Sequence, residues 1–160
     1  MKFSKRARYV LRMMLVFARQ STENGRVSLA EVARLTDMPK RYMEQLAIAL
    51  KNASLIEGVT GKGGGYRLTR PAAKIQIGDI IEAAIGPVRI VECLDRPDLC
   101  MRSTDCECLL LYDAINQRIT DVLYEFSLAD LAGKGWARKI SAVTNPKSRR
   151  TKSASKNKLK

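Results

Sequence analysis

Residues 39–68, PKRYMEQLAIALKNASLIEGVTGKGGGYRL, predict a helix followed at once by a β-hairpin. Pro39 suits the first turn of a helix that is expected to run to Ala53. Its buried stripe is predicted at Met43, Leu46, Leu50 and Ala53. Residues 55–60 and 66–68 have the character of short strands, and the glycines between them require a turn with permissive backbone angles. A hairpin placed directly after such a helix is typical of a winged helix-turn-helix domain.

The residues before this stretch supply the remaining helices of such a domain. Apolar residues at intervals of three and four predict a first helix over residues 4–20. Ser28 and Glu31 have the spacing of a capping box, which begins a second helix that should end by Thr36. Pro39 then starts the third helix, because proline is tolerated in a first turn but not inside a helix. The fold class is therefore mainly α with a small β wing.

The outer face of the third helix is polar in a way that suits DNA. It carries Lys40, Arg41, Tyr42, Glu44, Gln45 and Lys51. In the major groove Arg can bind guanine, Gln can bind adenine and Glu can accept from cytosine. A solvated helix face is the alternative interpretation, and the wing, to which Lys62 and Arg67 add positive charge, favours DNA. A nucleotide-binding loop is disfavoured, because Gly64 and Gly65 lead into a strand, where a Walker motif requires Gly-Lys-Ser/Thr and a helix.

Charge divides the chain into three zones and points to a polyanionic partner. The 160 residues include 29 Lys and Arg against 16 Asp and Glu, for a net charge of +13. Residues 1–70 carry 14 basic and 5 acidic side chains, residues 71–140 carry 8 and 11, and residues 141–160 carry 7 and none. We expect a DNA-binding domain over 1–70, a cysteine and dimerisation region over 71–140 and a disordered basic tail over 141–160.

Composition also excludes several classes of protein. The chain has no histidine, which excludes Ser–His–Asp and Cys–His catalysis and every histidine-containing metal site, so we predict that it is not an enzyme. Its longest uncharged apolar stretch, Met13 to Ala18, is far shorter than the ~20 residues of a membrane helix. Arg12 and Arg19 interrupt the apolar N-terminal stretch, which disfavours a signal peptide. We expect a cytoplasmic protein with no membrane partner and no small-molecule substrate.

Four cysteines lie within 16 residues and nowhere else in the chain. They are Cys93, Cys100, Cys106 and Cys108, spaced C-x6-C-x5-C-x-C. Structural disulfides are disfavoured in the cytoplasm, and the C-x2-C pairs of a zinc ribbon are absent. A looser set of thiolates suits an iron–sulfur cluster held by a flexible loop. Incidental thiols, some buried as small apolar groups, are the alternative.

The longest predicted helix runs from about Leu109 to Phe126. Its main apolar stripe is Leu111, Ile115, Ile119, Val122 and Phe126, and Leu110, Ala114 and Leu123 widen it. A helix so broadly apolar buries one side on its own domain and another on a partner. A two-fold dimer would place two recognition helices about one DNA turn, ~34 Å, apart. Burial inside a single domain is the alternative. Ser127 and Asp130 should cap a short final helix that Gly133 ends.

Several motifs resemble the Rrf-two family of bacterial transcriptional regulators over roughly residues 1–132. The matching segments are Met1-Lys2-Phe3-Ser4 leading into Arg8-Tyr9, Arg41-Tyr42-Met43-Glu44-Gln45-Leu46, Gly64-Gly65-Tyr66-Arg67-Leu68 and Gly78-Asp79-Ile80-Ile81-Glu82-Ala83. The resemblance implies a homodimer that binds partly palindromic double-stranded DNA. Base reading would fall on Glu44 and Gln45 with neighbouring Arg41 and Tyr42. The full set of residues expected to contact DNA is Ser28, Pro39, Lys40, Arg41, Tyr42, Glu44, Gln45, Thr60, Gly61 and Lys62.

The resemblance also implies metal ligands. Cys93, Cys100 and Cys106 fall on the positions of three ligating cysteines in cluster-binding members. Some members use a histidine as the fourth ligand, where this chain has Leu109, and others an N-terminal carboxylate, where it has Arg8. Cys108 is the expected substitute, with Asp105 or Glu107 as alternatives. We expect a 2Fe–2S cluster rather than a 4Fe–4S cluster. Aerobic preparation of the protein can remove it.

These observations suggest three functions. The first is a DNA-binding regulator, repressor or activator, whose operator affinity is controlled by the cluster and so by redox state, nitric oxide or iron. The second is a cluster-free regulator whose thiols sense oxidants directly. The third is a redox enzyme or cluster carrier, which would leave the polar helix face and the wing without a role.

Overall fold

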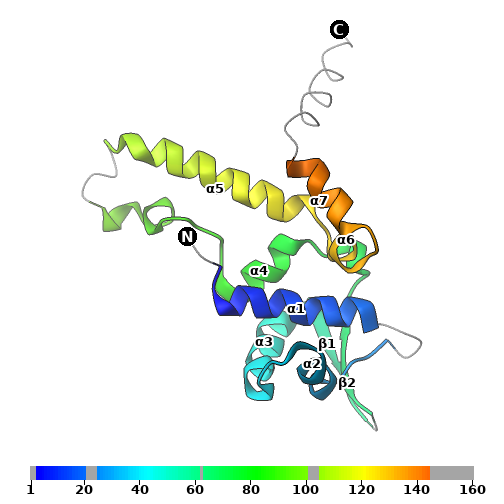
Figure 1. Cartoon of the computed structure of the whole chain (residues 1–160). Coiled ribbons are helices and arrows are strands. Elements are labelled where there is room, and N and C mark those ends of the chain that lie inside the picture. The colour runs from blue at the N-terminus through cyan, green and yellow to red at the C-terminus, as the bar shows by residue number, and fades with distance from the viewer. Residues whose placement is uncertain (1–2, 21–24, 62, 101–104, 145–160) are drawn as a thin grey trace.

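The N-terminal half consists of three helices and a hairpin around an apolar core. The computed structural model describes residues 3–20, 25–61, 63–100 and 105–144. Helices α1 (Lys5–Gln20), α2 (Leu29–Thr36) and α3 (Lys40–Asn52) precede strands β1 (Ile56–Val59) and β2 (Gly65–Leu68). Figure 1 shows α2, α3 and the hairpin on one side of α1. The predicted fold class is confirmed: the protein is mainly helical, with one small antiparallel sheet.

Helical periodicity explains which residues form the core. Helix α1 buries Ala7, Val10, Met13, Met14 and Phe17, and α3 buries Met43, Leu46, Ala47 and Leu50. The stripe predicted for α3 is thus correct at three positions and wrong at Ala53. That residue caps the helix and is exposed, because α3 has already ended at Asn52.

The capping box predicted at the start of α2 is only half formed, whereas α3 begins after Pro39 as predicted. Ser28 Oγ accepts a hydrogen bond from Glu31 N at 3.2 Å, so the serine caps α2. Among the described residues the Glu31 carboxylate makes no reciprocal bond, and only half of the capping box is present. Asp37, at φ 53°, ends α2 in the left-handed region. Pro39 is then the N-cap of α3.

The hairpin pairs Ile56 with Leu68 and Val59 with Gly65. A third short stretch joins it, since Val27 and Tyr66 exchange backbone hydrogen bonds of 2.8 and 2.9 Å. The sequence did not suggest this bridge. It explains one of the three consecutive glycines: a Cβ on Gly65 would lie 2.6 Å from the Val27 carbonyl oxygen. This glycine is therefore required by the packing inside the wing.

The C-terminal half connects the core to a long projecting helix. After the short helix η1 (Ala72–Lys74) come α4 (Ile77–Ile85), η2 (Glu92–Leu94), η3 (Pro97–Leu99), α5 (Glu107–Glu125), α6 (Leu128–Ala132) and α7 (Trp136–Thr144). Figure 1 shows α5 extending away from the body, with the segment that carries the cysteines at its N-terminal end. No described helix is long and apolar enough to cross a membrane.

The chain after α5 differs from the prediction in one respect. Ser127 and Asp130 form the expected capping box of α6, with Ser127 N donating to Asp130 Oδ2 at 2.9 Å. A further helix, α7, was not predicted and runs to Thr144. Ser141 to Thr144 are therefore helical and not part of a disordered tail. Residues 145–160, the rest of the predicted tail, lie outside the described residues.

Candidate nucleic-acid interface and cysteine segment

Helix α3 presents a polar outer face opposite its buried stripe. Lys40, Arg41, Glu44, Gln45 and Lys51 are exposed, as the sequence predicts, and Pro39 is exposed as well. The buried residues Met43, Leu46 and Leu50 fix the rotation of the helix, so this face cannot turn inward. Arginine, glutamate and glutamine on one free helix face can donate to and accept from base edges in a major groove.

Two of the residues predicted to contact DNA instead make contacts within the protein. The Tyr42 ring packs edge-on against Tyr9 of α1, with ring centroids 5.6 Å apart and planes at 82°. Ser28 is half-buried, and its hydroxyl caps α2. Both residues therefore hold the helix-turn-helix together. The cap by Ser28 follows the predicted spacing, whereas the contact of Tyr42 with Tyr9 was not predicted.

The wing turn contains the remaining predicted contacts. Thr60 and Gly61 are exposed, and Gly61 adopts φ 101°, a conformation that favours glycine. Lys62 lies outside the described residues. Arg67, expected to supply wing charge, pairs with Glu57 across the strands at 2.6 Å. Its charge is thus locally compensated.

Arg26 is a wing residue that the sequence analysis missed. A Cβ on Gly63 would lie 3.3 Å from Arg26 Nη2, so the guanidinium rests against the wing turn. No carboxylate among the described residues pairs with it. The sequence around Arg26 did not indicate this position. Arg26 directly precedes Val27, and only the bridge from Val27 to Tyr66 brings it to the hairpin.

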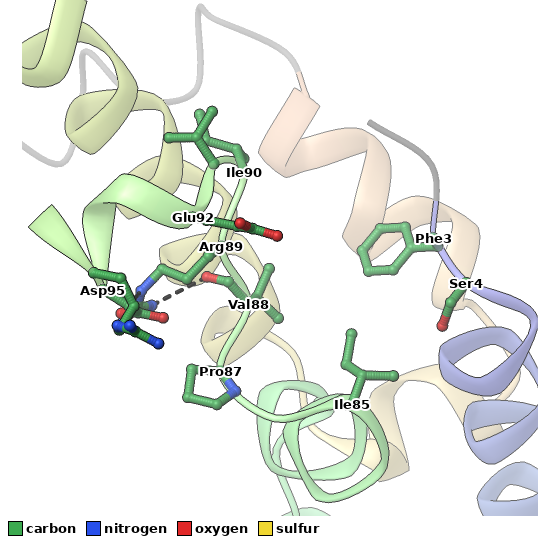
Figure 2. Close-up of a pocket in the computed structure, with 11 residues that line it drawn as sticks. Phe3, Ser4, Ile85, Pro87, Val88, Arg89, Ile90, Glu92 and Asp95 are labelled. Carbon is green, nitrogen blue, oxygen red and sulfur yellow. Dashed lines mark hydrogen bonds and ion pairs between the residues drawn. The ribbon is translucent and has the colours of Figure 1, made fainter. Parts of the chain in front are cut away.

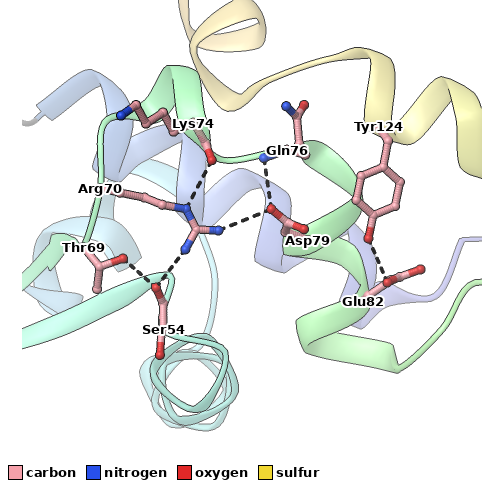
Figure 3. Close-up of polar contacts among 8 residues, drawn as sticks. All are labelled: Ser54, Thr69, Arg70, Lys74, Gln76, Asp79, Glu82 and Tyr124. Carbon is pink, nitrogen blue, oxygen red and sulfur yellow. Dashed lines mark hydrogen bonds and ion pairs between the residues drawn. The ribbon is translucent and has the colours of Figure 1, made fainter.

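A polar cluster joins the end of α3 to the start of α4 (Figure 3). Arg70 Nη1 donates to the Ser54 carbonyl at 3.2 Å, Nε donates to the Lys74 carbonyl at 3.2 Å, and Nη2 pairs with Asp79 Oδ2 at 3.3 Å. The same carboxylate oxygen accepts from Gln76 N at 3.3 Å, at the N-terminus of α4. One side chain therefore ties Ser54, two residues after the end of α3, to α4.

Helix α4 in turn contacts α5 through a close approach and a hydrogen bond. A Cβ on Gly78 would lie 2.4 Å from the Tyr124 ring, so this position of α4 admits only glycine while α5 stays in place. The Tyr124 hydroxyl donates to Glu82 Oε2 at 2.9 Å (Figure 3). Burial, and then the bond to Glu82, raise the pKa of Tyr124 to about 12. These contacts fix α5 against α4.

The four cysteines lie between the end of α4 and the first turn of α5, and all four are free. Cys93 lies in η2, Cys100 follows η3, Cys106 is the N-cap of α5, and Cys108 is exposed in the first turn of α5. In the described ranges, no three Cys, His, Asp or Glu side chains are close enough to share a metal ion. Thiolates suit an iron–sulfur group as donors. The described cysteines are not arranged as a site for such a group. Cys93, Cys100 and Cys106 would have to come closer together to bind one.

A pocket of about 750 Å³ lies beside the cysteine segment (Figure 2). Phe3 and Ser4, just before α1, form one wall, and residues 87–92, which lead directly to Cys93, form the other. Arg89 in that wall pairs with Asp95 at 2.6 Å. The residues on either side of Cys93 therefore lie next to the start of α1.

Helix α5 leaves an apolar face open. Leu111 is 59% exposed and Ile115 is 42% exposed. The only buried residue of α5 is Asn116, whose Oδ1 accepts a hydrogen bond from Ile90 N at 3.1 Å. An apolar groove of about 530 Å³ runs along this face. It is lined by Phe3, Ala114, Ile115, Arg118, Ile119, Val122 and Leu123. The predicted second apolar side of the helix is thus present and unpartnered in the single chain.

The polar face of α3 beside a hairpin defines a winged helix-turn-helix protein, the class used by many transcriptional regulators. The chain belongs to the Rrf2 family, since the family's sequence model, described as an iron-dependent transcriptional regulator, matches residues 3–134. The resemblance seen in the sequence is confirmed. The chain is accordingly a DNA-binding transcriptional regulator and not an enzyme.

Relatives and solved structures agree with this assignment. The chain is 35% identical over 131 residues to the HTH-type transcriptional regulator IscR of Vibrio campbellii, covering 82% of this chain and 77% of that protein. The structure of CymR, the global cysteine regulator of B. subtilis, superposes with a TM-score of 0.69 at 33% identity, covering 82% of this chain and 96% of that one. The oxidized form of Staphylococcus aureus CymR gives 0.68 at 32% identity, covering 84% and 98%.

Proposed function

We propose that this protein is a homodimeric regulator that binds a partly palindromic operator and whose DNA affinity depends on the state of its cysteines. The observation that carries the proposal is the exposed polar face of α3, which lies on the same side of α1 as the wing (Figure 1). A recognition helix and a wing on one side can contact a major groove and its adjacent backbone together. A DNA partner places this activity in the cytoplasm.

Base reading falls on Arg41, Glu44 and Gln45 in this proposal, because these side chains are exposed on α3. Lys40, the N-terminus of α3, Thr60, Gly61 and Lys62 contact the backbone. Ser28 and Tyr42 contribute by holding α2 and α3 in place. The +13 net charge adds long-range attraction to the phosphates.

The partner that covers the open face of α5 is a second copy of the chain. An exposed apolar stripe on a long helix favours two-fold pairing, since each copy buries the same surface. Pairing of two α5 helices sets the distance between two copies of α3. That distance has to match the spacing of two half-sites, so the relative position of α5 and α3 within one chain controls operator affinity.

Cys93, Cys100 and Cys106 would hold an iron–sulfur cluster in this proposal, with Cys108, Asp105 or Glu107 as fourth ligand. When bound, such a group supplies one-electron redox chemistry and sensitivity to nitric oxide and iron supply. Its binding requires the cysteine segment to close, and that segment directly precedes α5. Similarity to IscR and the family's description as iron-dependent support this version.

The contacts that run from α5 through α4 to the end of α3 offer a route for this coupling. A change at the start of α5 reaches α4 through Tyr124, Gly78 and Glu82. From α4 it reaches the end of α3 through Asp79, Arg70 and Ser54. Two arrangements of the cysteine segment would then correspond to two positions of the recognition helices, with different affinities for one operator.

Direct thiol sensing is the second candidate, and it is favoured because no three potential metal ligands lie together among the described residues. Two thiols, Cys106 and Cys108, lie at the start of α5, where Cys108 is exposed. Two of the four thiols could form a disulfide by passing two electrons and two protons to a peroxide. Similarity to CymR, solved elsewhere in an oxidized form, supports this version.

One preparation tests both versions. Protein purified without oxygen is analysed by absorption spectroscopy and for iron and sulfide, and its affinity for a duplex selected from a random library is measured with and without the cofactor. Stoichiometric iron, visible charge-transfer bands and an affinity that Cys100→Ala makes independent of iron support the cluster. Colourless protein whose DNA affinity responds to peroxide supports thiol sensing. An affinity that responds to neither overturns control by the cysteines.

A further inference from the structure

Ile48 is an apolar side chain in the middle of the polar outer face of α3. It is 60% exposed, the most exposed large apolar residue described before α4. At about 100° per residue, Ile48 lies roughly 40° around the helix from Glu44 and roughly 20° from Arg41. It is therefore flanked by the residues proposed to contact bases.

Packing within the chain does not account for this side chain. The buried stripe of α3 lies on the other side of the helix, and Ala47, the residue before Ile48, already completes it with 1% exposure. A single exposed apolar residue is common on protein surfaces. Here, however, it occupies the position between hydrogen-bonding side chains that point outward from a recognition helix.

We infer that Ile48 contacts the C5-methyl group of a thymine in each half-site. This inference rests on the proposed operator binding and adds a specificity determinant to it. In the major groove thymine is the only standard base that presents a methyl group, and apolar side chains recognise it by contact. Arg41, Glu44 and Gln45 can distinguish bases by hydrogen bonds, whereas Ile48 has none to offer and can distinguish only this methyl group.

The test replaces thymines by uracil, which removes the methyl and keeps every hydrogen-bonding group. A duplex is first selected from a random library with the full-length protein, and each thymine is then replaced in turn. The affinity of the wild type and of Ile48→Ala is measured for each duplex. Ile85→Ala is the matched control, because Ile85 is an exposed isoleucine on α4.

At one thymine per half-site, uracil should weaken wild-type binding about fourfold, as expected for one buried methyl. The same replacement should leave the affinity of Ile48→Ala unchanged, and Ile85→Ala should respond like the wild type. The inference is overturned if no uracil weakens the wild type, or if Ile48→Ala loses the same factor. A wild type that enriches no sequence overturns the proposed operator binding instead, and the inference with it.

Discussion

Arg26 and Arg67 both lie at the wing, but among the described residues only Arg67 is paired with a carboxylate. Arg67 is compensated by Glu57, whereas Arg26 lies against Gly63 without a described acidic partner. We therefore predict that Arg26→Ala weakens binding equally on selected and random duplexes. It should lower the slope of log affinity against log salt by about 1, as for one lost phosphate contact.

The matched control for this prediction is Arg67→Ala, measured by fluorescence anisotropy over the same salt series. This variant also removes one positive charge near the wing, but it frees Glu57, so its effect on affinity should include a repulsive part that Glu57→Gln removes. If Arg26→Ala leaves both affinity and salt slope unchanged, Arg26 is not a DNA contact.

The raised pKa of Tyr124 makes the free energy of unfolding depend on pH in the alkaline range. Its pKa is raised from 10 to about 12, chiefly by burial and then by the Glu82 carboxylate. Because the folded state binds this proton more tightly, its contribution is fully present below pH 10 and is lost as the pH rises towards 12. Denaturant unfolding from pH 9 upward should show this loss in the wild type and a smaller one in Tyr124→Phe. Equal pH dependence in both proteins would contradict the assignment.

At the scale of elements, Gly78 decides how closely α4 and α5 approach. Alanine normally stabilises a helix by about 1 kcal/mol relative to glycine. At Gly78 its Cβ would meet the Tyr124 ring at 2.4 Å, and overpacking of this kind costs about 1–3 kcal/mol. Gly78→Ala should therefore lower the free energy of unfolding in the wild type but raise it in the Tyr124→Ala background. The same sign in both backgrounds would rule out the ring contact as the cause.

Arg70 joins two elements with three different nitrogen atoms. Nε, Nη1 and Nη2 bond to Lys74, Ser54 and Asp79 respectively. Lysine has one terminal nitrogen and cannot reproduce this fork. We predict that Arg70→Lys and Arg70→Ala lower the free energy of unfolding by similar amounts, about 1–2 kcal/mol. Arg67→Lys, which can keep its pair with Glu57, should change it by less than about 0.5 kcal/mol. Full rescue by lysine at position 70 would contradict the clamp.

The elements that periodicity defines were predictable from the sequence. α1, α3 and α5 follow from apolar spacing, and the wing follows from its glycines. Helix α7 was missed because its last residues, Ser141–Thr144, stand directly before a stretch rich in Lys, Arg and Ser and were assigned to the tail. The roles of Tyr42 and Arg26 were not predictable, since each depends on a partner distant in the chain. The cysteine spacing identified candidate ligands, but spacing does not determine where a long loop places them.

At the scale of the whole molecule, DNA affinity should depend on pairing through α5. Ile115 lines the apolar groove, and Ile115→Glu would place a charge in the proposed interface. We predict that this variant is a monomer by sedimentation while the wild type is a dimer. Its affinity for a two-half-site duplex should fall by about 10²–10⁴, because the second half-site no longer binds at high effective concentration.

Two measurements separate loss of pairing from loss of the binding head. Affinity for a duplex with one half-site should be nearly unchanged in Ile115→Glu, because α3 and the wing lie on the far side of α1 from α5 (Figure 1). Gln117→Lys, which adds a charge about 160° around α5 from Ile115, should remain dimeric and bind both duplexes like the wild type. A monomeric wild type, or an Ile115→Glu dimer with full affinity, would show that another surface spaces the two recognition helices.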